Sequence, residues 1–266
     1  MRTLKQLQSL EGRVALITGG GGHLGRLFGE VACELGARVI LVDRDDSVFG
    51  VAAALAEHFG TPCEGRVLDL ADHQGVSDLP EAIAASHGRL DILINNAAFT
   101  GASGLPGWAV PFSQQGLEAW NAAMDINLLV PFLLSQKAAP FLTRGGEGSI
   151  VNVASIYGVT APDFRLYEGT GMGNPAAYNA SKAGLIQLSR YLATALAPGI
   201  RVNSISPGGI GRGQPDSFVE KYTARVPLGR MATEEDFKGV AQLLMSDLGA
   251  YITGQNLVVD GGWITW

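Results

Sequence analysis

The chain has 266 residues, of which 47% are apolar and 17% charged, and its net charge is −6 at pH 7. Abundant apolar residues argue against disorder, and the acidic balance argues against a nucleic-acid partner, because phosphate binding needs a basic face. No apolar run approaches the roughly 18 residues of a membrane-spanning helix, and the first residues lack the apolar core of a signal peptide. We therefore expect a cytoplasmic protein without a membrane partner.

Short β-branched runs alternate with longer Ala- and Leu-rich stretches along the chain. The predicted strands are 13–18, 38–43, 65–70, 90–96, 149–155, 200–206 and 255–261. The predicted helices are 23–36, 47–59, 73–87, 116–143, 176–197 and 233–247. Several strands are almost entirely apolar, which is typical of strands covered on both faces. The repeated strand–helix order predicts a single α/β domain over 1–266, a doubly wound parallel sheet between two helix layers, after an N-terminal extension of residues 1–10.

Two long segments, 99–115 and 156–175, fit neither pattern and are rich in Gly and Pro. Each follows the carboxyl end of a predicted strand, where open α/β sheets bind ligands. Long loops in compact domains are often functional. We therefore expect both segments to border a binding site.

A glycine-rich turn, TGGGGHLG at 18–25, joins the first strand to the helix that follows. Glycines permit a sharp turn and close approach to a pyrophosphate, and the helix N-terminus offers free N–H groups. Asp43 ends the second strand, where a carboxylate can hold the ribose hydroxyls of an adenosine. This carboxylate favours NAD because it repels the extra phosphate of NADP. Arg44 follows directly, which keeps NADP as the alternative.

The sequence YNASK places Tyr178 and Lys182 four residues apart near the start of a predicted helix, so that they share one face. A free phenol has a pKa of about 10, and acid–base work near pH 7 requires that pKa to fall by roughly three units. A neighbouring ammonium favours the phenolate and so lowers the pKa. By itself, however, this spacing is common on ordinary surface helices.

Several motifs occur together in an order and spacing typical of one family. They are TGGGGHLG, Asp43, NNAA at 95–98, Asn127, Ser155, YNASK and PGGI at 207–210. From about residue 11 to the C-terminus the chain resembles the short-chain dehydrogenases/reductases. This resemblance implies a Rossmann-type sheet of seven strands in the order 3-2-1-4-5-6-7. It also implies hydride transfer between a nicotinamide cofactor and a small-molecule alcohol or ketone, and a homotetramer or homodimer.

The resemblance implies roles for individual residues. Tyr178 resembles the general acid/base, and Lys182 resembles the residue that binds the nicotinamide ribose and lowers the phenol pKa. Ser155 resembles the residue that orients the substrate oxygen, and Asn127 the anchor of a water relay behind Lys182. Asn95 resembles an asparagine that stabilises the central sheet. The residues implied to contact the cofactor are Tyr178, Lys182, Gly19, Gly22, His23, Leu24, Gly25, Asp43, Asp69, Leu70, Asn96, Ala97, Pro207, Gly208 and Ile210.

Three features depart from the family pattern. His23 stands where a second glycine is expected, so the turn must accommodate a side chain, which we expect to point away from the phosphates. Ala98 ends NNAA where glycine is commoner. Ser155 and Tyr178 enclose a longer interval than usual. We interpret residues 156–177 as a substrate loop that carries an insertion.

The insertion bears the polar residues Asp163, Arg165, Glu168, Thr170 and Asn174. They favour a hydroxylated substrate, such as a sugar, polyol or sugar-acid derivative. The stretches SIYGVTAPDFRLYEGT, ISPGGI and VDGGW also resemble bacterial oxidoreductases associated with flagellin or nonulosonic-acid sugar modification. A hydrophobic carbonyl substrate, of the steroid or 3-oxoacyl type, is the alternative. A non-catalytic dinucleotide-binding protein is a further alternative, against which the complete set of predicted catalytic residues argues.

Other chemistries find little support in the sequence. The histidines and the two cysteines, Cys33 and Cys63, lack metal-ligand spacing, so we expect no metal site, and two cysteines form no disulfide framework. No G-x-S-x-G motif of a serine hydrolase occurs. We expect Trp263 and Trp266 to pack against another subunit. Prolines and glycines within 159–175 predict a mobile lid that orders over the substrate.

Overall fold

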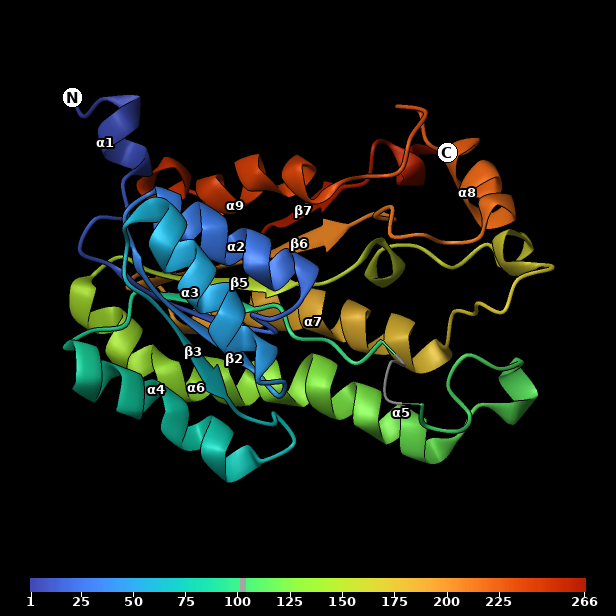
Figure 1. Cartoon of the computed structure of the whole chain (residues 1–266), viewed down its shortest axis with the longest axis horizontal. Coiled ribbons are helices and arrows are strands. Elements are labelled where there is room, and N and C mark those ends of the chain that lie inside the picture. Colours follow the sequence, from blue (N-terminus) through green and yellow to red (C-terminus); the bar gives the residue numbers. More distant parts are fainter. Residues whose placement is uncertain (101–103) are drawn as a thin grey trace.

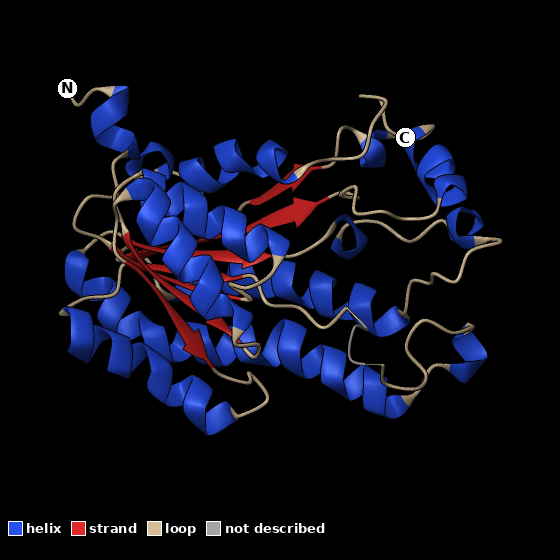
Figure 2. Ribbon diagram, in the orientation of Figure 1, coloured by secondary structure: helices blue, strands red, loops and turns tan. Residues whose placement is uncertain are grey.

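A seven-stranded parallel sheet forms the centre of the computed structural model, which describes residues 1–100 and 104–266 (Figures 1 and 2). The strand order is β3-β2-β1-β4-β5-β6-β7, which confirms the predicted Rossmann-type α/β domain. The strands are β1 (Val14–Thr18), β2 (Arg38–Asp43), β3 (Cys63–Val67), β4 (Ile92–Asn95), β5 (Gly148–Val153), β6 (Ile200–Pro207) and β7 (Asn256–Val259).

Helices cover both faces of the sheet (Figure 1). One layer contains α2 (His23–Glu34), α3 (Ser47–Phe59) and α9 (Lys238–Met245), and the other contains α4 (His73–His87), α6 (Val130–Leu142) and α7 (Ala176–Ala195). The shorter helices are α1 (Leu4–Gln8), α5 (Leu117–Met124) and α8 (Asp216–Thr223). None of the helices in residues 1–100 and 104–266 is both long and apolar enough to cross a membrane.

Successive strand residues enter two different apolar cores, because the side chains of a strand alternate between its faces. In β1, Ala15 and Ile17 belong to the core that also contains Phe28 of α2. Leu16, between them, belongs to the opposite core together with Leu134 of α6. With both faces covered, all five residues of β1 are buried, which explains why the strand is nearly continuously apolar.

Several predicted boundaries differ from the observed ones. The third strand covers Cys63–Val67 instead of 65–70, because the chain leaves the sheet edge and turns at Asp69, whose carboxylate accepts the Ala71 N–H. The predicted helix 116–143 is interrupted by a π-helical stretch, Asp125–Leu129. The short helices α1 and α8 were not predicted, because five and eight residues give too brief an apolar period.

A third apolar cluster lies outside the sheet and joins the 156–177 loop to α8 and the C-terminal segment. It consists of Ile156, Leu166, Phe218, Tyr222, Val226, Met231 and Trp263. Trp263 is only 2% exposed and stacks on Tyr222 with ring centroids 5.8 Å apart. The prediction that Trp263 packs against another subunit is therefore wrong, because α8 and the 156–177 loop of the same chain enclose it. Trp266 remains exposed, and its indole N–H donates to the Arg225 carbonyl at 3.0 Å.

Candidate functional site

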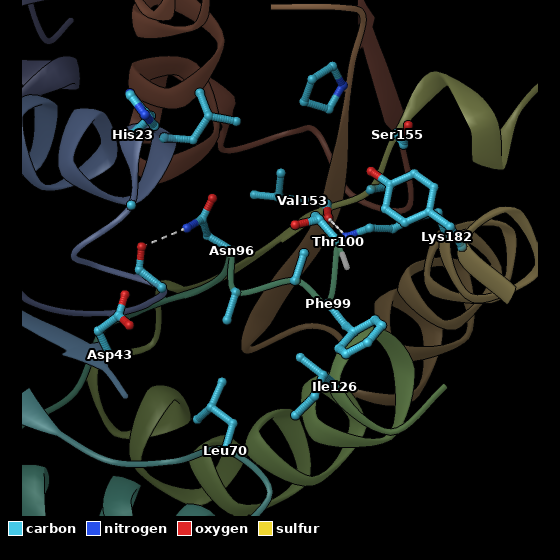
Figure 3. A pocket seen from close by; sticks show the side chains of 18 of the residues that line it. His23, Asp43, Leu70, Asn96, Phe99, Thr100, Ile126, Val153, Ser155 and Lys182 are labelled. Carbon is cyan, nitrogen blue, oxygen red and sulfur yellow. Dashed lines mark hydrogen bonds between the residues drawn. The ribbon is translucent and has the colours of Figure 1, made fainter. Parts of the chain in front are cut away.

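A cleft of about 730 Å³ lies at the carboxyl ends of the central strands (Figure 3). It spans the β1–β4 boundary, where the strand order reverses and where open α/β sheets bind ligands. Fifteen of the predicted site residues line it, and they come from segments that are far apart in the sequence. They are Gly19, Gly22, His23, Leu24, Asp43, Asp69, Leu70, Asn96, Ala97, Ser155, Tyr178, Lys182, Pro207, Gly208 and Ile210.

Two predicted site residues, Gly25 and Asn127, lie behind the cleft wall. Gly25 is buried in the first turn of α2, where an added Cβ would lie 1.9 Å from the Gly19 carbonyl oxygen. Asn127 is fully buried on the π-helical stretch, a feature frequent at functional sites. Its side chain accepts the Phe99 N–H at 2.7 Å and donates to Ser181 Oγ at 3.1 Å. Asn127 thus ties the loop after β4 to α7.

The glycine-rich turn has the shape of a phosphate cradle. Gly19 has a φ of +65°, and its Cβ would lie 2.9 Å from the Ala97 Cα, so both conformation and space require glycine. Gly22 precedes α2 and provides no capping side chain. The first N–H groups of a helix have no intrahelical partner. The uncapped start of α2 therefore fits the pyrophosphate of a dinucleotide.

The far end of the cleft carries the acidic residue predicted to face the adenosine. Asp43 ends β2, and its Oδ2 accepts the Gly21 N–H at 3.0 Å, which fixes the carboxylate beside the glycine-rich turn. Arg44 lines the same cleft. Asn96 donates through Nδ2 to the Thr18 carbonyl at 2.9 Å and to the Gly19 carbonyl at 3.2 Å (Figure 3), so this side chain also holds the turn in place.

Ser155 and Lys182 lie together at the other end of the cleft (Figure 3). Tyr178 lines the cleft beside them. Ser155 follows β5, and its hydroxyl lies close enough to the Tyr178 phenol to lower the phenol pKa. Lys182 lies one turn of α7 beyond Tyr178, and its Nζ is 5.8 Å from the centroid of the phenol ring. The same Nζ donates to the Val153 carbonyl at 2.7 Å. The four-residue spacing thus places the phenol and the ammonium on one face of α7, and the fold brings the Ser155 hydroxyl to the same end of the cleft.

Burial dominates the electrostatics of this group. It raises the pKa of Tyr178 above its usual value, and the Ser155 hydroxyl opposes this effect. It also lowers the pKa of Lys182 to about 7. In the protein alone, burial therefore disfavours the charged form of both residues.

The turn accommodates the His23 side chain by directing it toward the C-terminal part of the chain (Figure 3). Its Nδ1 lies 3.6 Å from Glu234 Oε1, and the side chain is 67% exposed. The cleft also includes residues that the sequence analysis missed, notably Arg212 and Gln214. They follow the PGGI motif in a Gly-rich stretch and carry no motif of their own, so only the folded chain reveals their position.

The charged residues of the insertion stabilise the loop itself. Asp163 forms ion pairs with Arg165 and with Arg225, which follows α8. Lys221 Nζ donates to the carbonyls of Arg165 at 3.0 Å and Glu168 at 3.1 Å. Asp163, Arg165 and Glu168 line neither the cleft nor the cavity beside it. They are therefore not placed to recognise polar groups of a substrate in the way the sequence suggested.

A second cavity, of about 1110 Å³, lies between the insertion, the described part of segment 99–115 and α7. Residues 101–103 of that segment lie outside the described residues. Its walls include Phe112, Phe164 and Met172, together with the polar Thr170 and Asn174 of the insertion. The cavity therefore combines apolar walls with a few hydrogen-bonding groups.

Comparison with known proteins places the chain among dinucleotide-dependent enzymes. Residues 24–264 match the family described as Enoyl-(Acyl carrier protein) reductase. The chain is 33% identical to 3-oxoacyl-acyl-carrier-protein reductase FabG of Thermotoga maritima, over 95% of this chain and 98% of that relative. A protein of Beutenbergia cavernae has a similar structure and is provisionally described as an NAD(P) dependent gluconate 5-dehydrogenase with bound NADP. It shares 34% sequence identity with this chain at a TM-score of 0.85, and the match covers 98% of this chain and 100% of that one. A Leptospira borgpetersenii short chain dehydrogenase with bound NAD+ shares 33% identity at a TM-score of 0.82, covering 99% and 96%.

Proposed function

The chain belongs to the short-chain dehydrogenase/reductase family of NAD(P)-dependent oxidoreductases, and we propose that it interconverts a secondary alcohol and a ketone of a sugar, polyol or sugar-acid derivative with NAD(H). The observation that carries this proposal is the convergence of Ser155, Tyr178 and Lys182 in the cleft that begins at the glycine-rich turn. A dinucleotide-binding protein without chemistry would not need this acid–base group.

The protein's own residues move the proton while the bound nicotinamide supplies or accepts the hydride. In the reducing direction, the Tyr178 phenol donates its proton to the substrate oxygen, and in the oxidising direction the phenolate takes it back. Ser155, which lines the cleft together with the phenol, donates to the same substrate oxygen and orients it. Lys182 holds the nicotinamide ribose and favours the phenolate, and Asn127 anchors a water relay behind it.

The residues along the cleft would hold a dinucleotide with its adenosine near Asp43 and its nicotinamide near Tyr178. The uncapped N-terminus of α2 holds the pyrophosphate, and Asp69, Leu70, Asn96 and Ala97 line the adenosine side. Pro207, Gly208 and Ile210 wrap the nicotinamide. The Asp43 carboxylate accepts the ribose hydroxyls and disfavours a 2′-phosphate, which supports NAD(H) over NADP(H).

Two observations bear on the substrate. Thr170 and Asn174 place a hydroxyl and an amide in the cavity wall, where both are also hydrogen-bonded to Tyr167. A similar structure is provisionally described as a gluconate 5-dehydrogenase. Both observations support a hydroxylated substrate. The largely apolar cavity beside the insertion and the similarity to a 3-oxoacyl reductase favour a second candidate, a hydrophobic 3-oxoacyl compound.

A substrate panel tests the proposed reaction. Purified protein is assayed at 340 nm with NAD+ and gluconate or polyols, with NADH and keto sugars, and with NADH and acetoacetyl-coenzyme A, in parallel with Tyr178→Phe. We expect turnover of a hydroxylated compound that Tyr178→Phe lowers at least 1000-fold, roughly 4 kcal/mol, while NADH affinity changes less than about twofold. Turnover of acetoacetyl-coenzyme A alone would select the second candidate. NADH binding without turnover of any compound would select a binding protein.

We also propose that the protein forms a homotetramer or homodimer. Leu129 and Phe132 are exposed next to a shallow apolar cavity that Leu128 and Leu188 line, across the π-helical stretch, α6 and α7. Exposed apolar patches of this kind mark protein interfaces. Light scattering during gel filtration tests this, and a mass of 27.9 kDa would identify a monomer and refute it.

A further inference from the structure

Three side chains from distant parts of the sequence meet at the mouth of the cleft. Glu234 begins a short 3₁₀ turn just before α9. Its Oε1 accepts a hydrogen bond from Arg212 Nε at 3.2 Å and lies 3.6 Å from His23 Nδ1. Because one oxygen makes both contacts, Arg212 and His23, the first residue of α2, both lie next to the Glu234 carboxylate.

The guanidinium of Arg212 is held by one edge. Its Nε bonds to Glu234, whereas its two terminal nitrogens form no hydrogen bond with any residue in 1–100 or 104–266. The backbone is also fixed, because the Arg212 N–H donates to Gln214 Oε1 at 2.7 Å and Gln214 Nε2 donates to the Ile210 carbonyl at 2.7 Å. The side chain is 37% exposed and lines the cleft. The terminal edge of a guanidinium is the edge that binds a phosphate through two parallel hydrogen bonds.

The position of Arg212 indicates that the anionic group it binds in the cleft is a phosphate. Pyrophosphates bind at helix N-termini, and α2 starts at His23. Among the described residues, the other Lys and Arg side chains in the cleft wall are Arg44, beside Asp43, and Lys182, buried beside Tyr178. Burial opposes ionisation of Glu234, but hydrogen bonds from its own backbone and from Arg212 outweigh this and lower its pKa. Glu234 is therefore a carboxylate at neutral pH.

We propose that Arg212 binds the pyrophosphate of the dinucleotide and that Glu234, contacted by His23, positions its guanidinium for this contact. The inference rests on the proposed function, because it requires a dinucleotide in the cleft. It also explains how the His23 side chain is used: the residue that replaces a glycine in the turn contacts the carboxylate that holds the arginine.

The test measures binding instead of turnover. NADH affinity is measured by fluorescence titration for wild type, Arg212→Gln, Arg212→Lys and Glu234→Gln. Arg230→Gln is the matched control, because Arg230 pairs with Asp236 at 2.6 Å next to the same turn but does not line the cleft. We expect Arg212→Gln to bind NADH about tenfold more weakly, since the lost contact is charge-assisted. Arg212→Lys and Glu234→Gln should lose part of the NADH affinity, and the control should keep all of it.

Cofactor fragments locate the contact on the dinucleotide. ADP-ribose and adenosine are titrated as competitors of NADH. Arg212→Gln should bind ADP-ribose, which contains the pyrophosphate, more weakly than wild type does. It should bind adenosine with the same affinity as wild type. Melting temperatures of all variants, expected to lie within a few degrees of wild type, establish that each is folded.

Several results would overturn the proposal. An unchanged ADP-ribose affinity in Arg212→Gln removes the phosphate contact, and a higher KM for the substrate with unchanged ADP-ribose affinity would assign Arg212 to an anionic substrate. Tighter NADH binding by Glu234→Gln would make Glu234 a competitor for the arginine instead of a positioning residue. Failure of the wild type to bind either NADH or NADPH is a different result, because it contradicts the proposed function itself.

Discussion

Burial of Lys182 destabilises the folded protein. Its side chain is 2% exposed, and burial lowers its pKa from 10.5 to about 7. One pKa unit corresponds to about 1.36 kcal/mol, so this shift costs up to about 5 kcal/mol of folding free energy when the ammonium is charged. Replacement by methionine, which is apolar and similar in length, should recover much of that free energy.

The pH dependence follows from the two pKa values. Between about pH 7 and 10.5 the unfolded chain keeps the Lys182 proton and the folded protein has lost it, so wild-type stability rises with pH in this window. Below pH 7 both states carry the proton, and the full cost is present. Methionine carries no proton in either state, so the advantage of Lys182→Met should be largest at and below pH 7 and shrink as the pH rises.

The expected magnitude includes one lost hydrogen bond. Removing the donor to the Val153 carbonyl costs about 1–2 kcal/mol. We therefore expect Lys182→Met to be more stable than wild type by about 3 kcal/mol at pH 7 and by less than about 1 kcal/mol at pH 9, with loss of turnover. Urea unfolding of both proteins at pH 7, 8 and 9 measures this, with Lys137→Met, on the exposed side of α6, as the control. A less stable variant at pH 7, or a difference that stays constant from pH 7 to 9, would refute the reasoning.

Three further predictions concern the turn, the cofactor preference and the loop. Gly25→Ala should weaken NADH binding at least tenfold in a fluorescence titration, because its Cβ would lie 1.9 Å from the Gly19 carbonyl oxygen; an unchanged affinity would show that the turn tolerates the methyl group. Asp43→Ala should narrow the preference for NADH over NADPH in the same assay, and tighter NADPH binding by the wild type would contradict that preference. If residues 159–175 close over the substrate, trypsin should cleave after the exposed Arg165 more slowly when cofactor and substrate are both present, and an equal rate would argue against a lid.

The sequence by itself determined the features of this protein that depend on residues close together along the chain. The apolar runs identified the strands of the sheet, because a strand covered on both faces must be apolar at almost every position. The four-residue spacing of Tyr178 and Lys182 placed them on one face of α7, because helix geometry requires it. The glycine-rich turn likewise follows from local backbone conformation, as the positive φ of Gly19 shows.

Only the tertiary structure decided which distant segments meet and how deeply each group is buried. The lowered pKa of Lys182 depends on its enclosure in the fold, which no spacing reveals. Asp163 pairs with Arg225 instead of facing a cavity, and Trp263 lies within its own chain, because α8 and the C-terminus pack against the insertion. The contact of Glu234 with His23 likewise depends on the packing of the turn before α9 against α2. Charge pairing and desolvation act through space, so they become visible only when the path of the chain is known.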